Sequence, residues 1–218
     1  MITDMAWFFE ALATRNSQHA IGPAEPETRY FAAKSERQAT PAEALEVVRF
    51  WQDAGPQLWF AKNPEFDRRF RERFLALHEA AACGGLAGWT ASPYGSLGLL
   101  LLLDQFPRNA FRGTPRMYGT DAMARTRARA AIAAGHDQTV PVDLRLFMYL
   151  PFGHSEEIAD QDRSVALSLS LGEPHLAHAE HHRGIVRRFG RFPHRNAILG
   201  RETTPEEQRF LDEGGFAG

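Results

Sequence analysis

Three stretches of the chain concentrate polar residues where helices are expected to meet loops. In residues 102–113, Asp104 lies near the C-terminal end of an apolar helix, where the helix dipole disfavours a carboxylate by about 0.3–1 kcal/mol. A residue that breaks a local rule is typical of a functional position or of a specially braced one. Arg108 or Arg112, in the segment that follows, is the natural partner. The stretch is either a structural Asp–Arg brace or one wall of a ligand pocket.

The second stretch is residues 150–157. His154 stands just before the expected start of a helix and is followed by Ser155, Glu156 and Glu157. Histidine carries protons near neutral pH, and a helix start offers free amide donors to an anion. We expect Ser155 to be the N-cap. His154 has either a capping role or a role in a site.

The third stretch, residues 181–201, contains no acidic residue and six arginines: Arg183, Arg187, Arg188, Arg191, Arg195 and Arg201. Such a density of positive charge repels itself unless anions lie close by. Those anions are either a bound phosphate or carboxylate, or carboxylates from elsewhere in the chain. The internal candidates are Asp104, Glu156, Glu157 and Asp160.

A possible metal site lies beside this stretch. His175, His178 and His182 fall on one face of a helix, next to Glu180 and His181. Imidazoles bind zinc, but the H-E-x-x-H order and a matching carboxylate on a third helix are missing. We therefore expect ordinary surface histidines and no metal. Nucleotide-binding glycine motifs are also missing, and no cofactor is predicted.

Composition narrows the class of protein. The 218 residues carry a net charge of −2, which argues against a general nucleic-acid binder, although all but two of the 25 basic residues are arginines. The apolar run 97–103 is far shorter than the roughly 20 residues of a membrane span, and no secretory signal is visible. The side chain of the single cysteine, Cys83, is expected to be buried. A single cysteine also fits a protein of a reducing compartment. We therefore predict a cytoplasmic protein that binds neither nucleic acid nor a membrane. The sequence predicts no oligomeric state.

Helix signals dominate the chain, and strand signals are weak. The expected helix starts are Thr40, Asn63, Ser92, Thr120, Ser155 and Thr204, with capping boxes at the first and last of these. The expected stops are Gly84, Pro107, Gly135, Pro151 and Gly172. Helices of this length with short connections predict an all-α fold of antiparallel helical hairpins. Residues 1–40 read as an extension, one short helix plus a linker, and residues 41–218 as the helical domain.

Several longer strings carry a resemblance. They are residues 49–51, 59–60, 66–67, 73–81, 103–109, 111–113, 150–152, 154–156 and 190–196. With these strings the chain resembles the bacterial DUF924 family, uncharacterised proteins with a helical, TPR-like fold, over roughly residues 42–212. The resemblance implies that the hairpins stack in a TPR-like superhelical array. It implies no established reaction.

Most of the polar candidates match the family motifs. They are Asp104, Gln105, Arg108, Asn109, Arg112, His154, Glu156, His182, Arg183, Arg191, His194, Arg195 and Asn196. Three positions depart from the family: Gly153 replaces its usual Glu, Gly184 replaces a common Asp, and Asn63 replaces a frequent Asp. If either of the first two family acids takes part in chemistry, this chain lacks it.

Three hypotheses of function remain, and whether the protein is an enzyme is left open. The leading one is a binding module that holds a small phosphate or carboxylate ligand, or an acidic peptide, in an Arg/His pocket. Its ligand-binding residues would be Gln105, Arg108, Asn109, Arg112, His182, Arg183, Arg191, Arg195 and Asn196. The alternative is a hydrolase acting on a phosphate or carboxylic ester. Its catalytic candidates are His154, His194, Glu156 and Asp104. The third is a structural scaffold for protein partners.

Overall fold

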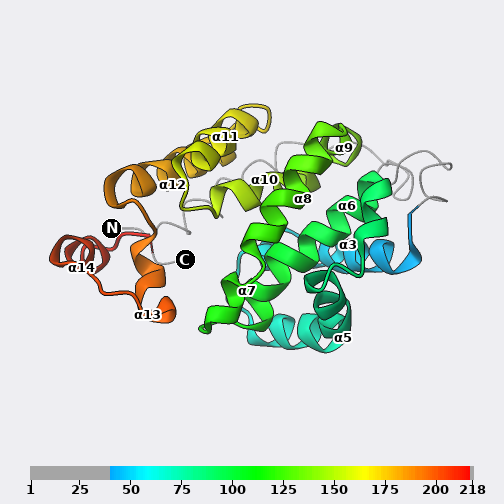
Figure 1. Cartoon of the computed structure of the whole chain (residues 1–218), viewed down its shortest axis with the longest axis horizontal. Helices are drawn as coiled ribbons and strands as arrows, with labels where there is room; N and C mark the ends of the chain where they lie inside the picture. Colours follow the sequence, from blue (N-terminus) through cyan, green and yellow to red (C-terminus); the bar gives the residue numbers. More distant parts are fainter. Residues whose placement is uncertain (1–39, 217–218) are drawn as a thin grey trace. The chain divides into compact units, whose positions relative to one another are not determined.

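The computed structural model describes residues 40–216, and within this range the chain forms helices and no strand (Figure 1). The predicted all-α class is therefore confirmed. The described residues belong to two compact units, 40–154 and 155–216, which are treated separately below. The extension predicted for residues 1–40 lies almost wholly outside the described residues, so that boundary stays a prediction, as does the TPR-like stacking.

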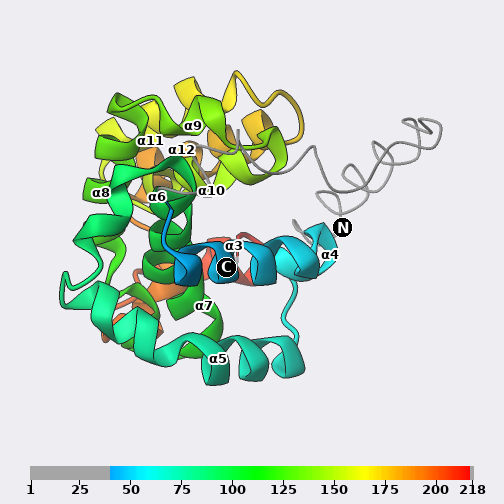
Figure 2. The ribbon, with the colours of Figure 1, turned by 90° about the vertical axis from the view of Figure 1, so that its right-hand side faces the viewer.

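The first unit is built around a buried helix. Its elements are α3 (Ala42–Ala54), α4 (Pro56–Trp59), α5 (Pro64–Ala82), η1 (Ala87–Ala91), α6 (Pro93–Leu100), η2 (Leu101–Gln105), α7 (Phe106–Ala110), η3 (Pro115–Tyr118), α8 (Asp121–Ala133), α9 (His136–Thr139) and α10 (Val142–Gly153). Helix α6 packs against both α3 and α8 (Figure 2). Gly98 permits the close approach to α3, because a Cβ atom there would lie 3.0 Å from the carbonyl oxygen of Ala44.

An aromatic core joins α3, α5 and α10. The Trp51 ring meets the Phe147 ring edge-on at 5.3 Å between centroids and lies 5.4 Å from Phe70. All three side chains are fully buried. Edge-to-face aromatic pairs add about 0.5–1.5 kcal/mol beyond the area that they bury. This core fixes α3 and α5 against each other.

The side-chain caps at helix starts behave in two ways. Asn63 accepts a hydrogen bond from the Phe66 amide at 2.9 Å, and Ser92 accepts one from the Gly95 amide at 3.2 Å, as predicted. The capping box predicted at Thr40 is wrong, because the Thr40 hydroxyl donates to the Ser92 hydroxyl at 2.8 Å. That tertiary contact replaces the local cap, and Pro41 becomes the N-cap of α3.

Neither proline predicted to end a helix does so. Pro151 lies inside α10, which continues to Gly153. Pro107 lies in α7, directly after the π-helical turn η2. Because proline has no backbone N–H, Pro107 cannot donate a hydrogen bond to the carbonyl oxygen of Leu103, four residues before it, or to that of Leu102, five residues before it. Side chains bind both: Thr120 Oγ1 donates to the Leu103 oxygen at 2.5 Å, and His78 Nδ1 lies 2.9 Å from the Leu102 oxygen.

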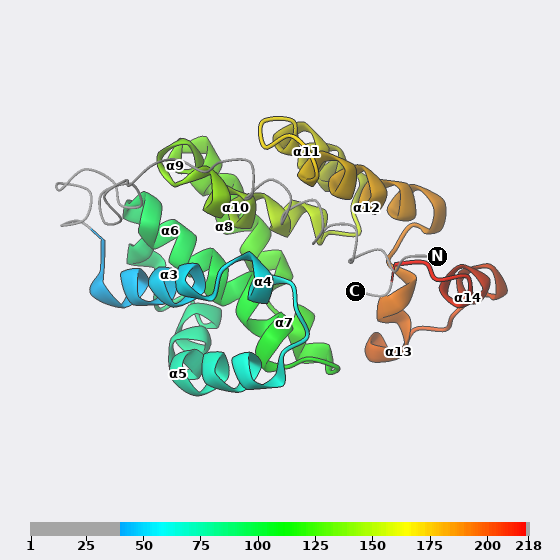
Figure 3. The same cartoon turned by 180° about the vertical axis from the view of Figure 1, so that it is seen from behind.

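The second unit is a helical pair with a short C-terminal subassembly. Its elements are α11 (Ile158–Ser168), α12 (His175–Phe189), η4 (Pro193–Arg195), α13 (Asn196–Leu199) and α14 (Pro205–Asp212). Helices α11 and α12 lie side by side (Figure 3). The capping box predicted at Thr204 is confirmed. Helix α11 begins at Ile158 with Glu157 as its N-cap, so the prediction of Ser155 as the cap is wrong: the Ser155 hydroxyl accepts from the Glu157 amide at 3.2 Å and donates to the Asp160 carboxylate at 2.8 Å.

Two further observations concern the described residues. None of their helices is long and apolar enough to cross a membrane. Cys83 is the C-cap of α5 and is exposed, so its predicted burial is wrong. The helix ends one residue before it, and the cap position turns outward toward the following glycine turn.

Candidate functional site

The buried carboxylate of Asp104 is the centre of the first candidate site. Asp104 lies in the π-helical turn η2, and its side chain is 1% exposed. Single π-helical turns inside helices frequently mark functional positions. The turn is followed by Pro107, which has no N–H to continue the regular hydrogen-bond ladder, and it places a carboxylate in the interior of the unit.

Three side chains contact the Asp104 carboxylate, and one of them, Arg108, carries a permanent positive charge. His154 Nδ1 lies 2.8 Å from Oδ1, Gln105 Nε2 donates to Oδ2 at 2.6 Å, and Arg108 Nη1 lies 3.3 Å from Oδ1. Burial raises the pKa of Asp104, but three effects outweigh it and lower the pKa to about 2: the positive charge of Arg108, the charge of His154, which is protonated at the low pH where Asp104 titrates, and the hydrogen bonds from His154 and Gln105. The carboxylate is therefore ionised at neutral pH.

The proton on His154 follows from this charge. An ionised carboxylate only accepts hydrogen bonds, so Nδ1 of His154 carries the proton that it donates to Asp104. Burial and the charge of Arg108 lower the pKa of His154, although the Asp104 and Asp121 charges oppose the shift. The neutral imidazole consequently presents Nε2 as a lone pair. The His154 side chain is 17% exposed, and within the described residues its one hydrogen bond is the one from Nδ1.

Arg108 is held between two carboxylates. Its Nη1 donates to Asp121 Oδ1 at 2.8 Å and to the Asp104 carbonyl oxygen at 2.8 Å, and its Nη2 donates to Asp121 Oδ2 at 3.0 Å. The two carboxylates raise the pKa of Arg108 against the opposing effect of burial. Arg108 is thus a confirmed partner of Asp104, as one of the two arginines predicted. We call Asp104, Gln105, Arg108, Asp121 and His154 the His154 centre.

The other two candidates of this stretch meet a different acid. Asn109 Nδ2 donates to Asp67 Oδ1 at 2.7 Å, and Arg112 Nε donates to Asp67 Oδ2 at 3.0 Å. Asp67 lies in the first turn of α5, so these bonds fasten the end of α7 and the segment after it to the start of α5. A structural brace was one of the two roles predicted for Arg112, but its acid is Asp67 and not Asp104.

In the second unit, Glu156 and Arg201 form an ion pair. Arg201 Nη1 and Nη2 donate to the two Glu156 oxygens at 2.6 and 3.0 Å, and the Phe192 amide donates to Glu156 Oε1 at 2.9 Å. Burial raises the pKa of Glu156, but these bonds outweigh it and lower the pKa. The carboxylate accepts three charge-assisted or amide bonds and is an anchor for the loop around Phe192.

Glu207 anchors a second arginine. Arg191 Nε and Nη2 donate to its two oxygens at 2.6 and 2.8 Å, and Asn196 Nδ2 lies 3.3 Å from Oε2. The bond from Arg191 lowers the pKa of Glu207 to about 2, despite the opposing effect of burial. The side chain of Glu207 is 3% exposed. A bidentate pair of this kind is a strong charge-assisted contact.

The remaining candidates gather around aromatic rings. Buried His182 lies edge-on to Phe216, with 4.6 Å between ring centroids, and the ring of His194 lies 5.0 Å from the same phenyl group. Arg195 is buried, with its guanidinium 4.5 Å from the centre of the Phe192 ring. Arg183 lies 3.4 Å from Asp162. Within residues 40–216 no three His, Cys, Asp or Glu side chains gather as a metal site.

Five of the six arginines of the acid-free stretch therefore pair with internal carboxylates. Besides Arg191 and Arg201, the surface arginines of α12 pair with acids: Arg187 with Asp162 at 2.9 Å and Arg188 with Glu206 at 3.0 Å. Glu156 is the one acid that the sequence analysis had named among these partners. Glu206 and Glu207 were read only as a helix cap, and nothing in their local sequence distinguishes an arginine anchor from a cap.

The candidate residues thus fall into two groups. Asp104, Gln105, Arg108 and His154 come together in the His154 centre, with Asn109 and Arg112 on Asp67 in the same unit. The candidates from Glu156 onward belong to the second unit. Asp121 is the member of the His154 centre that sequence reasoning missed. Its only signal, a position at a helix start, is common to many surface acids.

The chain was compared with known proteins. The model of a family described as "Bacterial protein of unknown function (DUF924)" matches residues 47–215. Among solved structures, the chain is similar to the "Structure of Protein of Unknown Function ATU0120 from Agrobacterium tumefaciens". The identity is 57% and the TM-score 0.78, over 79% of this chain and 98% of that chain. A comparison with curated proteins found no match.

Proposed function

Because the chain belongs to the DUF924 family, whose description assigns no activity, we propose a function from the geometry alone: a hydrolase that uses His154 as general base. One observation carries the proposal. The buried, ionised Asp104 accepts a hydrogen bond from His154 Nδ1 at 2.8 Å and so turns Nε2 into the proton acceptor. A carboxylate that fixes the tautomer and orientation of an imidazole is the supporting half of many acid–base centres.

The proposed reaction is the hydrolysis of an ester. His154 Nε2 takes a proton from water while the water oxygen bonds to the carbonyl carbon. The ester C–O bond of the resulting adduct then breaks, and the imidazolium returns the proton to the departing alkoxide. The products are an acid and an alcohol, and the imidazole is restored. Asp104 stays ionised throughout and stabilises the imidazolium between the two proton transfers.

Charge favours a carboxylic ester over a phosphate ester. Two carboxylates, Asp104 and Asp121, face one guanidinium, Arg108, whose two Nη atoms both donate to them or to the backbone. The formal charges of the five residues of the His154 centre therefore sum to −1 when His154 is neutral, and this negative charge disfavours a phosphate dianion. An uncharged acyl group meets no such repulsion.

The same pairing bears on the leading hypothesis from the sequence. An anion held by Arg108, Arg112 or Arg191 would have to displace Asp121, Asp67 or Glu207 from distances of 2.6–3.0 Å. Arginines already neutralised in this way support the hydrolase alternative in the first unit. Binding of an anion or acidic peptide by the motif arginines stays a prediction.

Hydrolysis of p-nitrophenyl acetate and p-nitrophenyl phosphate by the full chain tests the proposal. We expect hydrolysis of the acetate above the rate of free imidazole, with kcat/KM rising with pH and levelling off below pH 6.5, because the pKa of His154 is lowered. His154→Gln should lose activity by about 10²–10⁴-fold, the usual contribution of general acid–base catalysis. The control is His181→Gln, which replaces an exposed histidine of the second unit.

Two results would contradict the proposal. One is a wild-type rate no higher than that of imidazole on any ester tested. The other is a His154→Gln variant that keeps the wild-type rate. Melting temperatures of both variants separate loss of chemistry from loss of fold. If His154→Gln unfolds, the pH profile of the wild-type chain decides, because a plateau reached only above pH 7 excludes a base with a lowered pKa.

A further inference from the structure

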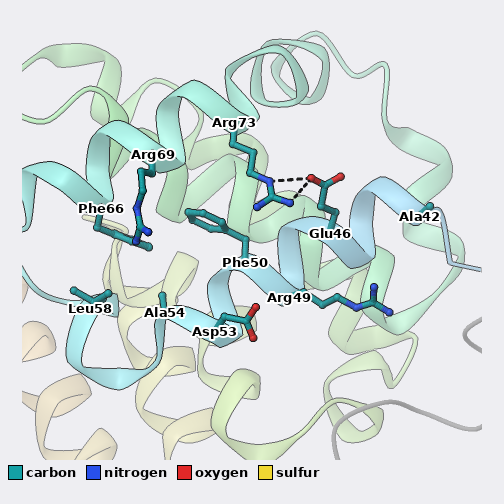
Figure 4. Close-up of a pocket in the computed structure, with 10 residues that line it drawn as sticks. All are labelled: Ala42, Glu46, Arg49, Phe50, Asp53, Ala54, Leu58, Phe66, Arg69 and Arg73. Atoms are coloured by element: carbon teal, nitrogen blue, oxygen red, sulfur yellow. Dashed lines mark hydrogen bonds and ion pairs between the residues drawn. The ribbon is translucent and has the colours of Figure 1, made fainter. Parts of the chain in front are cut away.

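A cavity of about 610 Å³ opens between α3 and α5, on a part of the first unit that the His154 centre does not use. Its wall carries Glu46, Arg49, Phe50 and Asp53 from α3, and Arg69 and Arg73 from α5 (Figure 4). Small-molecule sites are typically about 300–1,000 Å³ and combine apolar walls with a few polar groups. The cavity has the size and the mixed lining of such a site.

The charges of the cavity are unequal. Three guanidinium groups face two carboxylates. Arg73 is engaged, because its Nε and Nη2 donate to Glu46 Oε1 at 2.9 and 2.7 Å, and its guanidinium lies over the rings of Phe50 and Phe74 at 5.6 and 5.4 Å. The formal charges of the lining residues in the described part of the chain therefore sum to +1.

Arg69 is the cation that differs from its neighbours. In the described part of the chain, no carboxylate lies within ion-pair distance of the Arg69 guanidinium. Its positive charge, together with that of Arg68, lowers the pKa of Glu65, one helical turn away. Arg68, the preceding residue, is held by Glu65 at 2.7 Å and Glu72 at 2.8 Å. In Figure 4 the Arg69 side chain descends from α5 beside Phe66 along the wall of the cavity.

The cavity also has an aromatic floor. The half-buried ring of Phe50 stacks on Phe66 and Phe70, with centroid distances of 5.5 and 5.3 Å. Leu58 completes the apolar part of the wall near Arg69. The ring of Phe50 is thus held in place by the core below it. An apolar group that enters the cavity therefore packs against a ring that its neighbours already hold, so the ring itself loses little conformational freedom.

We propose that this cavity binds a small organic monocarboxylate, with the carboxylate on Arg69 and the apolar body against Phe50. A guanidinium matches a carboxylate with two parallel hydrogen bonds. A single negative charge balances the excess of the wall, whereas a phosphate dianion exceeds it. The inference does not depend on the hydrolase proposal, since it uses other residues and a different readout.

Isothermal titration of the full chain with phenylacetate, its uncharged amide and inorganic phosphate tests the inference. Phenylacetate should bind, its affinity should fall with added salt, and both other probes should bind more weakly. Arg69→Gln should weaken phenylacetate binding about two- to fivefold, because Arg69 is exposed and an ion pair in contact with solvent is weakened by screening. Arg68→Gln is the matched control: it removes the same charge from the adjacent position, which is exposed like Arg69 but lies outside the cavity wall.

Three results would overturn the inference. They are no heat with phenylacetate at millimolar concentration, equal affinities for phenylacetate and its amide, or equal losses in the Arg69→Gln and Arg68→Gln variants. Amide shifts by NMR provide the second measurement, and perturbations outside α3 and α5 would also count against this site. Absence of ester hydrolysis would refute the proposed function and leave this result unaffected.

Discussion

Replacing Asp104 with asparagine tests the electrostatics of the His154 centre. The substitution keeps the size and shape of the side chain and leaves an acceptor for His154 Nδ1, but it removes a charge that is buried inside the first unit. Arg108 keeps Asp121 as a partner, so the variant does not strand an unpaired cation. The free energy of unfolding lost in the variant therefore comes mainly from the interactions between the ionised Asp104 carboxylate and its hydrogen-bond donors.

The magnitude follows from the pKa. For Asp104 it falls from 3.8 to about 2 in the folded chain, and each pKa unit corresponds to about 1.36 kcal/mol. Ionisation of Asp104 thus stabilises the fold by roughly 2–3 kcal/mol at neutral pH. Because the folded-state pKa is the lower one, this contribution is complete above about pH 4 and is lost as the pH falls toward 2. The variant should be destabilised at pH 7 and approach the wild-type chain at low pH.

Urea and thermal unfolding measure the effect. At about 2–4 °C per kcal/mol for a chain of this size, Asp104→Asn should lower the melting temperature by about 5–10 °C at pH 7. The control is Glu79→Gln, which removes an exposed carboxylate of the same unit that pairs with Arg116 and should cost less than about 1 kcal/mol. Equal stabilities of Asp104→Asn and the wild-type chain at pH 7 would refute the ionised state of Asp104.

Two further perturbations test the packing of the helices and the second unit. Gly95→Ala should destabilise the chain by about 1–3 kcal/mol, because its Cβ would overlap the Trp89 carbonyl oxygen. Gly184→Ala in α12, where a Cβ meets open space, should instead stabilise it by about 0.5–1 kcal/mol; unfolding curves with the opposite order would contradict this packing. Glu207→Gln should flatten the loss of stability of the wild-type chain between about pH 4.5 and 2, because the pKa of Glu207 is lowered to about 2. An unchanged acid limb in urea titrations would argue against that ion pair.

Local signals predicted the helices well where the capping group and its partner are neighbours in sequence. Asn63, Ser92 and Thr204 each bond an amide three residues later, so the sequence alone suffices to place these helix starts. Thr40 and Thr120 are also capping-type residues at predicted helix starts. Their hydroxyls instead bond the Ser92 hydroxyl and the Leu103 carbonyl oxygen. These partners lie 52 and 17 residues away, and no local pattern predicts them.

The candidate site shows the same division. The unusual position of Asp104 and the histidine before Ser155 were visible in the sequence, and they do meet. The arginine surplus was also visible, but its partners Asp67, Asp121 and Glu207 look like ordinary residues of a first helical turn. The cavity at Arg69 was not predicted from the sequence, because the charged face of α5 looks like an ordinary exposed surface. Only the packing of α5 against α3 shows which of its arginines lies beside the ring of Phe50.

The most direct test of the central claim is the protonation state of His154, read from ¹⁵N–¹H correlation spectra of its imidazole over a pH series. At pH 7 we expect a neutral ring with the proton on Nδ1 and the lone pair on Nε2. Titration should occur below pH 6.5. A ring protonated on Nε2 at pH 7, or one still charged at that pH, would contradict the proposed base.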